Sequence, residues 1–405
     1  MARARFIADL LPTHLDDLAF LGAQRRQALG SPAHTLKTFG ELNERLEAHV
    51  QGLLVAPRAH LLPWLSGLLN EADRDEVFAA AYGLLRLDDE TAAHAVLVAF
   101  AQAVGPRLAG LRDALSLAPP VHTAAPLHAA LMQAKPEVAV AAAVVLANHR
   151  MLDAQTSRLP ALLRSEDAEQ AAWAWRAVHL ADVRAQAAAP GFAPVRPLPA
   201  GVGHASPVVR HAAWHAAAWT APAHTLAALR QRATAADPVA WHWLAVLGGA
   251  DDVPLIQQAV QAQPDPQARC ALLARWGHPT ALHALVRWME TADVPLAVAA
   301  GEAYSRITAW DIRGERRRLP VPDDADDFTR EMAPDVWMPD AARAAQLLAQ
   351  HGERWQAGLR WCAGHCLDGA VSASVLWQLD LSARWDVAAR AALAGRMVSA
   401  PPPLF

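Results

Sequence analysis

The chain has 405 residues, of which 53% are apolar and 19% are charged, and its formal net charge is −4. A mildly acidic chain has no overall attraction to phosphate, which disfavours sequence-independent binding to nucleic acid. Its three cysteines exclude a disulfide framework and favour a reducing compartment, so we expect a cytoplasmic protein.

The first residues, MARARFIADLLPTH, contain an apolar run that Asp9 and Pro12 keep shorter than the core of a signal peptide. The longest uncharged apolar run, at 138–147, has about half the length that a bilayer span requires. We therefore expect neither a signal peptide nor a contact with the membrane.

Residues 1–70 are predicted to form a helical cap. Leucines recur at helical spacing in two stripes, and charged residues fill the positions between them. Such a cap closes the end of a repeat array and keeps it soluble. The stripes are Leu15, Leu18 and Leu21, followed by Leu42, Leu46 and Val50.

One motif recurs about every thirty residues across 71–310: a Pro or acidic residue, an aliphatic residue, and then a pair of small residues. Proline in the first turn lacks only an N–H that would be unpaired there, and the preceding Ser or Asp can cap the helix. Paired alanines let a neighbouring helix approach closely. We predict about eight stacked helical hairpins, with a Pro/Gly-rich insertion at 187–206. The motifs begin near Asp75, Pro106, Pro136, Glu166, Pro207, Pro238, Pro266 and Pro295.

The unit SPVVRHAAWHAAA, with Pro207, Val209, Arg210 and the pair Ala212 and Ala213, resembles the HEAT repeat in its short bacterial form. The abundance of alanine and the scarcity of Tyr and Phe favour helix over strand, so we expect an all-α fold. The resemblance implies an α-solenoid of HEAT-like helical hairpin repeats, which the helical N-terminal cap and a C-terminal helical segment would flank.

A second resemblance covers most of the chain. Residues 14–55 and 338–366 are similar to an uncharacterised family of bacterial HEAT-like proteins, often encoded near type VI secretion and effector genes. This resemblance implies an accessory interaction role, and it supplies no catalytic residue.

The stretch HAAWHAAAW, at 211–219, places two histidines and two tryptophans on one side of a helix and small residues on the other. In the next unit His242 occupies the place of His211, beside Trp241 and Trp243. This bulky side is either an interaction surface, because Trp is enriched at interfaces, or the filling of a repeat junction with its N–H groups bonded locally. A metal site at the two histidines is a third reading. The residues concerned are His211, Trp214, His215, Trp241, His242 and Trp243.

Residues 311–340 break the repeat. Four prolines make this stretch a poor helix, so we predict a charged loop or an extended segment. It is either a solvated insertion whose opposite charges neutralise each other or an arm that contacts a partner. The partner-contacting residues would be Arg316, Arg317, Arg318, Asp323 and Asp324.

Residues 341–405 regain the helical period, and helices are expected through 340–369 and again over 372–397. On such a helix Cys362, His365 and Cys366 share one turn. They are either three soft metal ligands, although structural zinc usually takes a fourth, or buried thiols beside a helix-face histidine. The tail PPPLF cannot be helical at its prolines, so Leu404 and Phe405 either dock on the body, are disordered or are presented to another molecule.

Familiar catalytic signatures are missing from the sequence, including a His-Glu dipeptide, HExxH, a P-loop, GxSxG and CxxC. We therefore predict no catalytic residue, no cofactor and no resident metal. The predicted function is a non-catalytic scaffold or adaptor that binds a protein, such as a secreted effector or a secretion component. The alternative is a nucleic-acid-binding protein or an enzyme similar to the HEAT-like DNA glycosylases, with the fifteen tryptophans stacking on bases.

Overall fold

The computed structural model describes residues 8–188, 198–321, 324–355, 359–396, 398–399 and 402–405. Helices dominate these residues, and the strands among them form two small two-stranded sheets, which confirms the all-α class. None of the described helices combines the length and the apolar character that a bilayer crossing requires. The chain divides into two compact units. Unit 1 comprises residues 1–222, 380–385 and 399–405, and unit 2 comprises residues 223–379 and 386–398.

Unit 1 contains the N-terminal helices and the first five motif helices. Of the predicted insertion at 187–206, residues 189–197 lie outside the described residues. The elements are η1 (Ala8–Leu10), α1 (Leu11–Ala28), α2 (Leu36–Leu54), α3 (Arg58–Leu68), α4 (Arg74–Leu85), α5 (Glu90–Gln102), α6 (Gly105–Leu117), α7 (Ala124–Gln133), α8 (Pro136–Asn148), α9 (Leu159–Leu162), α10 (Ala168–Ala188), α11 (Leu198–Val202) and α12 (Pro207–Thr220).

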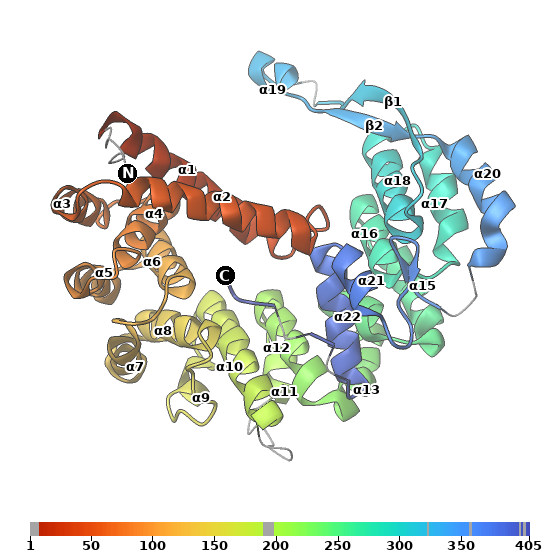
Figure 1. Cartoon of the computed structure of the whole chain (residues 1–405). Helices are drawn as coiled ribbons and strands as arrows, with labels where there is room; N and C mark the ends of the chain where they lie inside the picture. Colours follow the sequence, from red (N-terminus) through yellow and green to blue (C-terminus); the bar gives the residue numbers. More distant parts are fainter. Residues whose placement is uncertain (1–7, 189–197, 322–323, 356–358, 397, 400–401) are drawn as a thin grey trace. The chain divides into compact units, whose positions relative to one another are not determined.

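Five helices of unit 1 contact one another in chain order: α4 packs on α6, α6 on α8, α8 on α10, and α10 on α12 (Figure 1). Each begins at a repeat of the motif, and paired alanines such as Ala142 and Ala213 are completely buried. The approach is close at Gly110, where a Cβ would lie 2.3 Å from the carbonyl oxygen of Arg74. The predicted helices and their small contact faces are therefore confirmed.

The leucine stripes of α1 and α2 are also confirmed, since all six residues are at most 8% exposed. They join the core that continues through α4, α6, α8, α10 and α12. Burying these stripes removes apolar surface from water, which is the main stabilising contribution in a helical protein of this kind.

Acidic residues cap motif helices as predicted. Asp237 accepts a hydrogen bond from the backbone N–H of Val239 at 3.1 Å, and Asp265 accepts one from Gln267 at 2.9 Å. Ser206 stands in the equivalent position before α12 but makes no side-chain cap bond. The carboxylates thus satisfy N–H groups that have no partner within the helix.

Unit 2 contains the remaining motif helices, and α22 is shared because its first residues belong to unit 1. Its elements are α13 (Pro222–Thr234), α14 (Pro238–Leu247), η2 (Ala250–Asp252), α15 (Val253–Ala262), α16 (Pro266–Trp276), α17 (Ala281–Met289), α18 (Val294–Thr308), β1 (Arg313–Arg318), α19 (Asp327–Glu331), β2 (Asp335–Pro339), α20 (Ala341–His351), η3 (Gly352–Arg354), β3 (Trp361–Cys362), β4 (His365–Cys366), α21 (Ala373–Gln378) and α22 (Leu381–Leu393).

The helix predicted through 340–369 is wrong for the described residues after His351, namely 352–355 and 359–369, none of which is α-helical. Strands β3 and β4 pair as a tight antiparallel hairpin instead. Ala363 and Gly364 form its turn with φ values of 49° and 72°, the left-handed geometry of a two-residue hairpin loop.

The hairpin is stabilised by hydrogen bonds to backbone carbonyls at the C-terminal ends of α16 and α18. The N–H of Trp361 donates to the carbonyl oxygen of Gly277, just after α16, at 2.8 Å. The N–H of Gly364 donates to the carbonyl oxygen of Ile307, in the last turn of α18, at 3.0 Å. The last carbonyls of a helix have no partner inside it, so the hairpin satisfies groups that would otherwise be unpaired.

Candidate functional site

The stretch predicted as a charged loop, 311–340, contains an antiparallel ribbon made of β1 and β2, with α19 between them in sequence (Figure 1). Arg316 lies opposite Trp337 in the ribbon, and an irregularity interrupts the register between Arg313 and Arg316. The alternative of an extended segment is therefore the correct one. We call residues 313–339 the arm.

The base of the arm is fixed to neighbouring helices. Pro339 packs on Gly301 of α18 so closely that a Cβ on this glycine would lie 2.6 Å from the proline Cβ. The N–H of Asp340 donates to the carbonyl oxygen of Ile312 at 2.7 Å, and the Asp340 carboxylate caps α20 through the N–H of Arg343 at 2.8 Å. The arm is thus held at its base by backbone and packing contacts.

The basic residues of the arm lie mainly on β1, whereas most of its acidic residues lie at its tip, which consists of α19 and the residues next to it. The predicted partner-contacting residues Arg316, Arg317, Arg318 and Asp324 are all exposed, and Asp323 lies outside the described residues. The guanidinium of Arg316 lies 4.9 Å from the ring centroid of Trp337, a cation–π distance. The strand β1 is therefore basic, whereas acidic residues gather before and within α19.

The arm also carries exposed apolar side chains that the sequence pattern did not indicate. Phe328 is 71% exposed, Met332 is 64% exposed and Trp337 is 45% exposed, and no residue of α19 is buried. Nothing in the local pattern distinguishes these residues from core residues. Large apolar side chains gathered on one projecting element, however, are typical of an interaction site.

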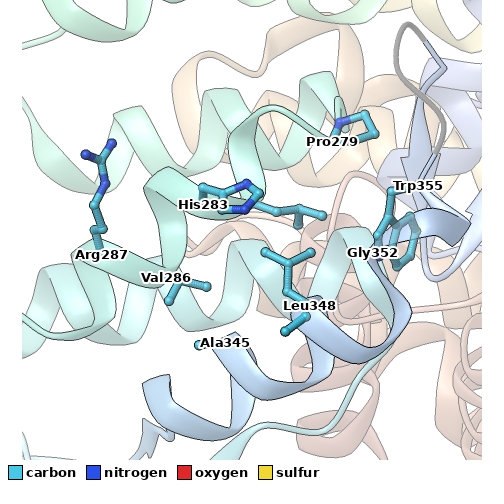
Figure 2. A pocket seen from close by; sticks show the side chains of 10 residues that line it. Pro279, His283, Val286, Arg287, Ala345, Leu348, Gly352 and Trp355 are labelled. Atoms are coloured by element: carbon cyan, nitrogen blue, oxygen red, sulfur yellow. The ribbon is translucent and has the colours of Figure 1, made fainter.

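A second surface of unit 2 is an open groove of about 830 Å³ between α17 and α20 (Figure 2). Its walls are mainly apolar, and the exposed side chains of His283 and Arg287 lie along α17. The other lining residues are Pro279, Leu282, Val286, Ala345, Leu348, Ala349, Gly352 and Trp355. Only Ala344 of α20 is buried, so this helix is covered on one side alone.

The predicted surface on α12 is not formed by its tryptophans. Trp214 and Trp219 are 1% and 6% exposed, and the ring of His179, on α10, lies 5.9 Å from that of Trp219. His211 and His215 are half-buried, and His215 meets His179 of α10 with ring centroids 4.7 Å apart. The packing interpretation is therefore the correct one here, although the buried indole N–H of Trp214 has no hydrogen-bond partner in the described structure.

The matching residues of α14 are also part of the packing. Trp241 and Trp243 are 7% and 4% exposed, and the indole N–H of Trp241 donates to the carbonyl oxygen of Ala233 at 3.0 Å. His242 is half-buried, with its Nε2 3.0 Å from the guanidinium of Arg275. The six residues predicted as an interaction surface thus lie mostly inside unit 1 or unit 2.

Cys362, His365 and Cys366 do not share a helical turn, because they belong to the β3–β4 hairpin. Cys362 is buried, whereas the imidazole of His365 lies 3.1 Å from the side-chain oxygen of Gln378. Across the part of the chain that the structure describes, no group of three His, Cys, Asp or Glu side chains is arranged to hold a metal ion.

Comparison of the chain with models of protein families, with curated proteins and with solved structures gave no match. The resemblance to HEAT repeats and to the bacterial family therefore rests on sequence patterns alone. Function has to be argued from the surfaces described above.

Proposed function

We propose that this protein is a non-catalytic interaction scaffold that binds another protein through the arm. The observation that carries the proposal is the exposure of Phe328 and Met332 at the tip of the arm. These side chains add nothing to a core, and each would contribute roughly 1.5–3 kcal/mol if a partner buried it. A partner with an apolar pocket for the tip fits this surface.

The distribution of charge on the arm favours one orientation of a bound partner. Residues 311–340 contain nine acidic and five basic side chains, with Arg316, Arg317 and Arg318 together on β1. An arm that is basic along one strand and acidic near its tip favours one docking direction over the reverse. We expect the partner to carry acidic residues where it faces β1.

Successive contacts among the motif helices support the further proposal of a HEAT-like solenoid, in which each hairpin buries the apolar face of the next one. The groove between α17 and α20 would then offer a second docking surface on the same scaffold. The resemblance stated above suggests where to search for partners: among secreted effectors and components of type VI secretion.

The test compares two variants in affinity purification from the source cells, followed by binding measurements with purified partners. The double variant Phe328→Ser, Met332→Ser should lose partners that the wild type retains, with affinity reduced at least about 30-fold for a hot spot of about 2 kcal/mol. The matched control is Val104→Ser, Val121→Ser, which removes side chains that are 64% and 69% exposed in unit 1. If every partner binds both variants equally, the arm is not the binding site.

A second candidate function is binding to nucleic acid through β1. It is favoured by the six exposed positions of this strand, four of which are arginines, with Trp337 beside two of them. A β-ribbon can enter the major groove of DNA. Retention on DNA or RNA at low salt that Arg316→Ala, Arg317→Ala and Arg318→Ala abolish would support this function over protein binding.

A further inference from the structure

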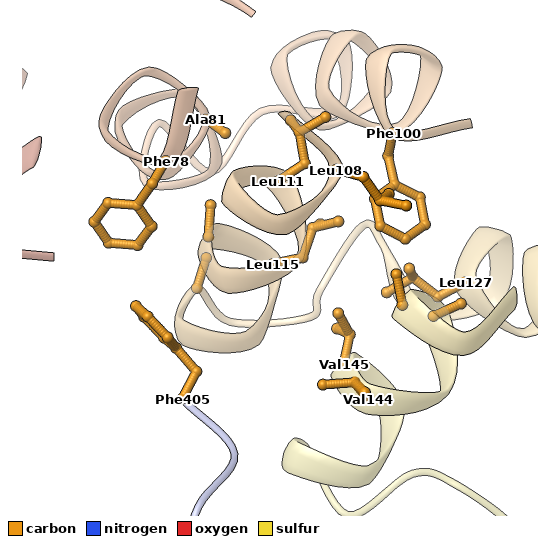
Figure 3. Packing of buried hydrophobic residues seen from close by; sticks show 14 of the residues in the cluster. Phe78, Ala81, Phe100, Leu108, Leu111, Leu115, Leu127, Val144, Val145 and Phe405 are labelled. Carbon is orange, nitrogen blue, oxygen red and sulfur yellow. The ribbon is translucent and has the colours of Figure 1, made fainter. Parts of the chain in front are cut away.

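Residues 402–405, with the sequence Pro-Pro-Leu-Phe, dock on helices of unit 1 that are distant in sequence. Phe405 is only 3% exposed and belongs to the core of that unit. The N–H of Leu404 donates to the side-chain oxygen of Asn148, at the end of α8, at 3.1 Å. Figure 3 shows the Phe405 ring facing Phe78 of α4.

The pocket for Phe405 is formed by α1, α2 and α4. The Phe78 and Phe405 rings lie 5.4 Å apart, and the guanidinium of Arg25 lies 4.9 Å from the Phe405 centroid and 5.1 Å from that of Phe39. The pocket walls have contacts of their own. Phe78 stacks on Tyr82 with centroids 5.7 Å apart, and Arg25 donates from Nε to the side-chain oxygen of Asn43 at 2.8 Å. The pocket is therefore held together without residues 402–405.

The docked segment is held quite differently. Residues 402–405 form no helix or strand, and as described none of their backbone groups bonds to another backbone group. Pro403 is exposed, and Pro402 and Leu404 are half-buried. One buried aromatic anchor and one backbone hydrogen bond, on a proline-rich segment without helix or strand, are the contacts of a bound peptide ligand.

The charge in the pocket indicates what a ligand would add. Arg25 is 6% exposed, and its Nη1 is buried with no hydrogen-bond partner in the described structure. Burial lowers the pKa of Arg25 to about 10, against the opposing effects of Tyr82 and Asp113, so the side chain stays charged at neutral pH. An acidic group placed beside the aromatic ring would supply the missing acceptor.

We propose that the pocket of Arg25, Phe39 and Phe78 is a peptide-docking site that residues 402–405 fill as an intramolecular ligand. Its partner is a protein segment with a Leu-Phe pair followed by an acidic residue, which displaces Leu404 and Phe405. The site uses no residue of the arm, so it stands or falls independently of the proposed function.

The test uses a chain shortened by residues 402–405, with its fold checked by circular dichroism and gel filtration. The probe is a fluorescein-labelled peptide with the sequence VSAPPPLF, made as a C-terminal amide and titrated by fluorescence anisotropy. We expect it to bind the shortened chain at least tenfold more tightly than the full chain, whose own segment competes. Replacing the peptide Phe by Ala should weaken binding at least tenfold.

Two variants in the shortened chain examine the contacts. Asn148→Ala removes the acceptor for the Leu404 N–H and should weaken the peptide severalfold. Extending the peptide by two Asp should strengthen binding at least fivefold relative to two Lys, and Arg25→Met should abolish that difference. Arg25→Met keeps an apolar stem of similar length, so the pocket walls are disturbed as little as possible.

Several results would overturn the proposal. If the shortened chain and the Phe405→Ala variant both lose their helical structure, the segment is a permanent part of the core. If the shortened chain folds but does not bind the peptide, or binds it no better than the full chain does, the pocket is not an exchangeable site. If the full chain forms dimers that shortening abolishes, the occupant is a second copy rather than a partner protein.

Discussion

The imidazoles of His179 and His215 meet inside unit 1, on helices α10 and α12. His179 is 2% exposed, and both of its ring nitrogens lack a hydrogen-bond partner in the described structure. Burial, with a smaller effect of His215, lowers the pKa of His179 well below its usual value. Burial also lowers the pKa of His215 to about 3, helped by His211 and Arg176. Both imidazoles are therefore neutral in the folded protein at neutral pH.

This neutrality makes the free energy of unfolding depend on pH. Below the usual imidazole pKa, near 6.5, His179 binds a proton in the unfolded chain but stays neutral in the folded protein. The free energy of unfolding therefore keeps its full value above pH 6.5 with respect to this group. It declines as the pH falls below 6.5, by about 1.4 kcal/mol per pH unit for one such group. We expect His179→Leu to reduce this slope between pH 6.5 and 5, and to leave stability at pH 7 equal or slightly higher, because two unpaired nitrogens are removed.

Urea unfolding at several pH values measures the effect. The matched control is His94→Leu, which replaces an exposed imidazole on α5. An unchanged slope in His179→Leu would mean that this imidazole binds protons equally in the folded and the unfolded protein.

Residues 211–219 show what a helical pattern in the sequence can and cannot predict. The spacing of residues 211–219 correctly separates a bulky side from a small side, but periodicity does not say which neighbour covers each side. Here His179 of α10 packs on Trp219, and Trp214 is buried as well. Buried charge is harder still to predict. Arginine is rarely buried, so nothing local marks Arg25 as the wall of a pocket.

At the scale of elements, helices with a repeated start signal were predictable, and the β3–β4 hairpin was not. The motif combines proline, a capping residue and alanines, which all favour a helix locally. Residues 361–366 have no comparable signal, and their conformation depends on the carbonyls at the ends of α16 and α18. Gly364 was the one available cue, but Ala363 in the left-handed region is uncommon and hides it.

The attachment of the arm gives a prediction about α18. In Gly301→Ala the added Cβ would lie 2.6 Å from the Cβ of Pro339 and 3.0 Å from its Cγ, and the rigid proline ring cannot turn away. We expect the base of the arm to shift and the free energy of unfolding to fall by about 1–3 kcal/mol. Urea unfolding measures this change.

The control is Gly67→Ala in α3, where a Cβ would meet nothing within 4 Å. Alanine is the better helix former, so this variant should be more stable by roughly 0.5–1 kcal/mol. Equal gains in both variants would show that the packing of Pro339 does not restrict residue 301.

At the scale of the whole molecule, unit 1 is completed by residues from near the other end of the sequence. The N–H of Leu381 donates to the carbonyl oxygen of His34 at 2.7 Å, and Thr35 and Asp380 form an isolated β-bridge. The indole N–H of Trp385 donates to the carbonyl oxygen of Leu29 at 2.7 Å. A linear repeat pattern predicts contacts between neighbours in sequence, so these contacts could not be predicted from it.

The contribution of these long-range contacts to the stability of unit 1 can be tested by hydrogen exchange. Trp385→Ala removes the donor to Leu29 and the half-buried ring beside it, so the end of α1 and the following turn should open more often and exchange faster. Peptides from α5 should exchange at the wild-type rate. Trp377→Ala is the matched control, because this tryptophan, eight residues earlier, is 58% exposed. If both variants leave the exchange near Leu29 unchanged, the returning segment contributes little to the stability of unit 1, and its fold depends on neighbouring repeats alone.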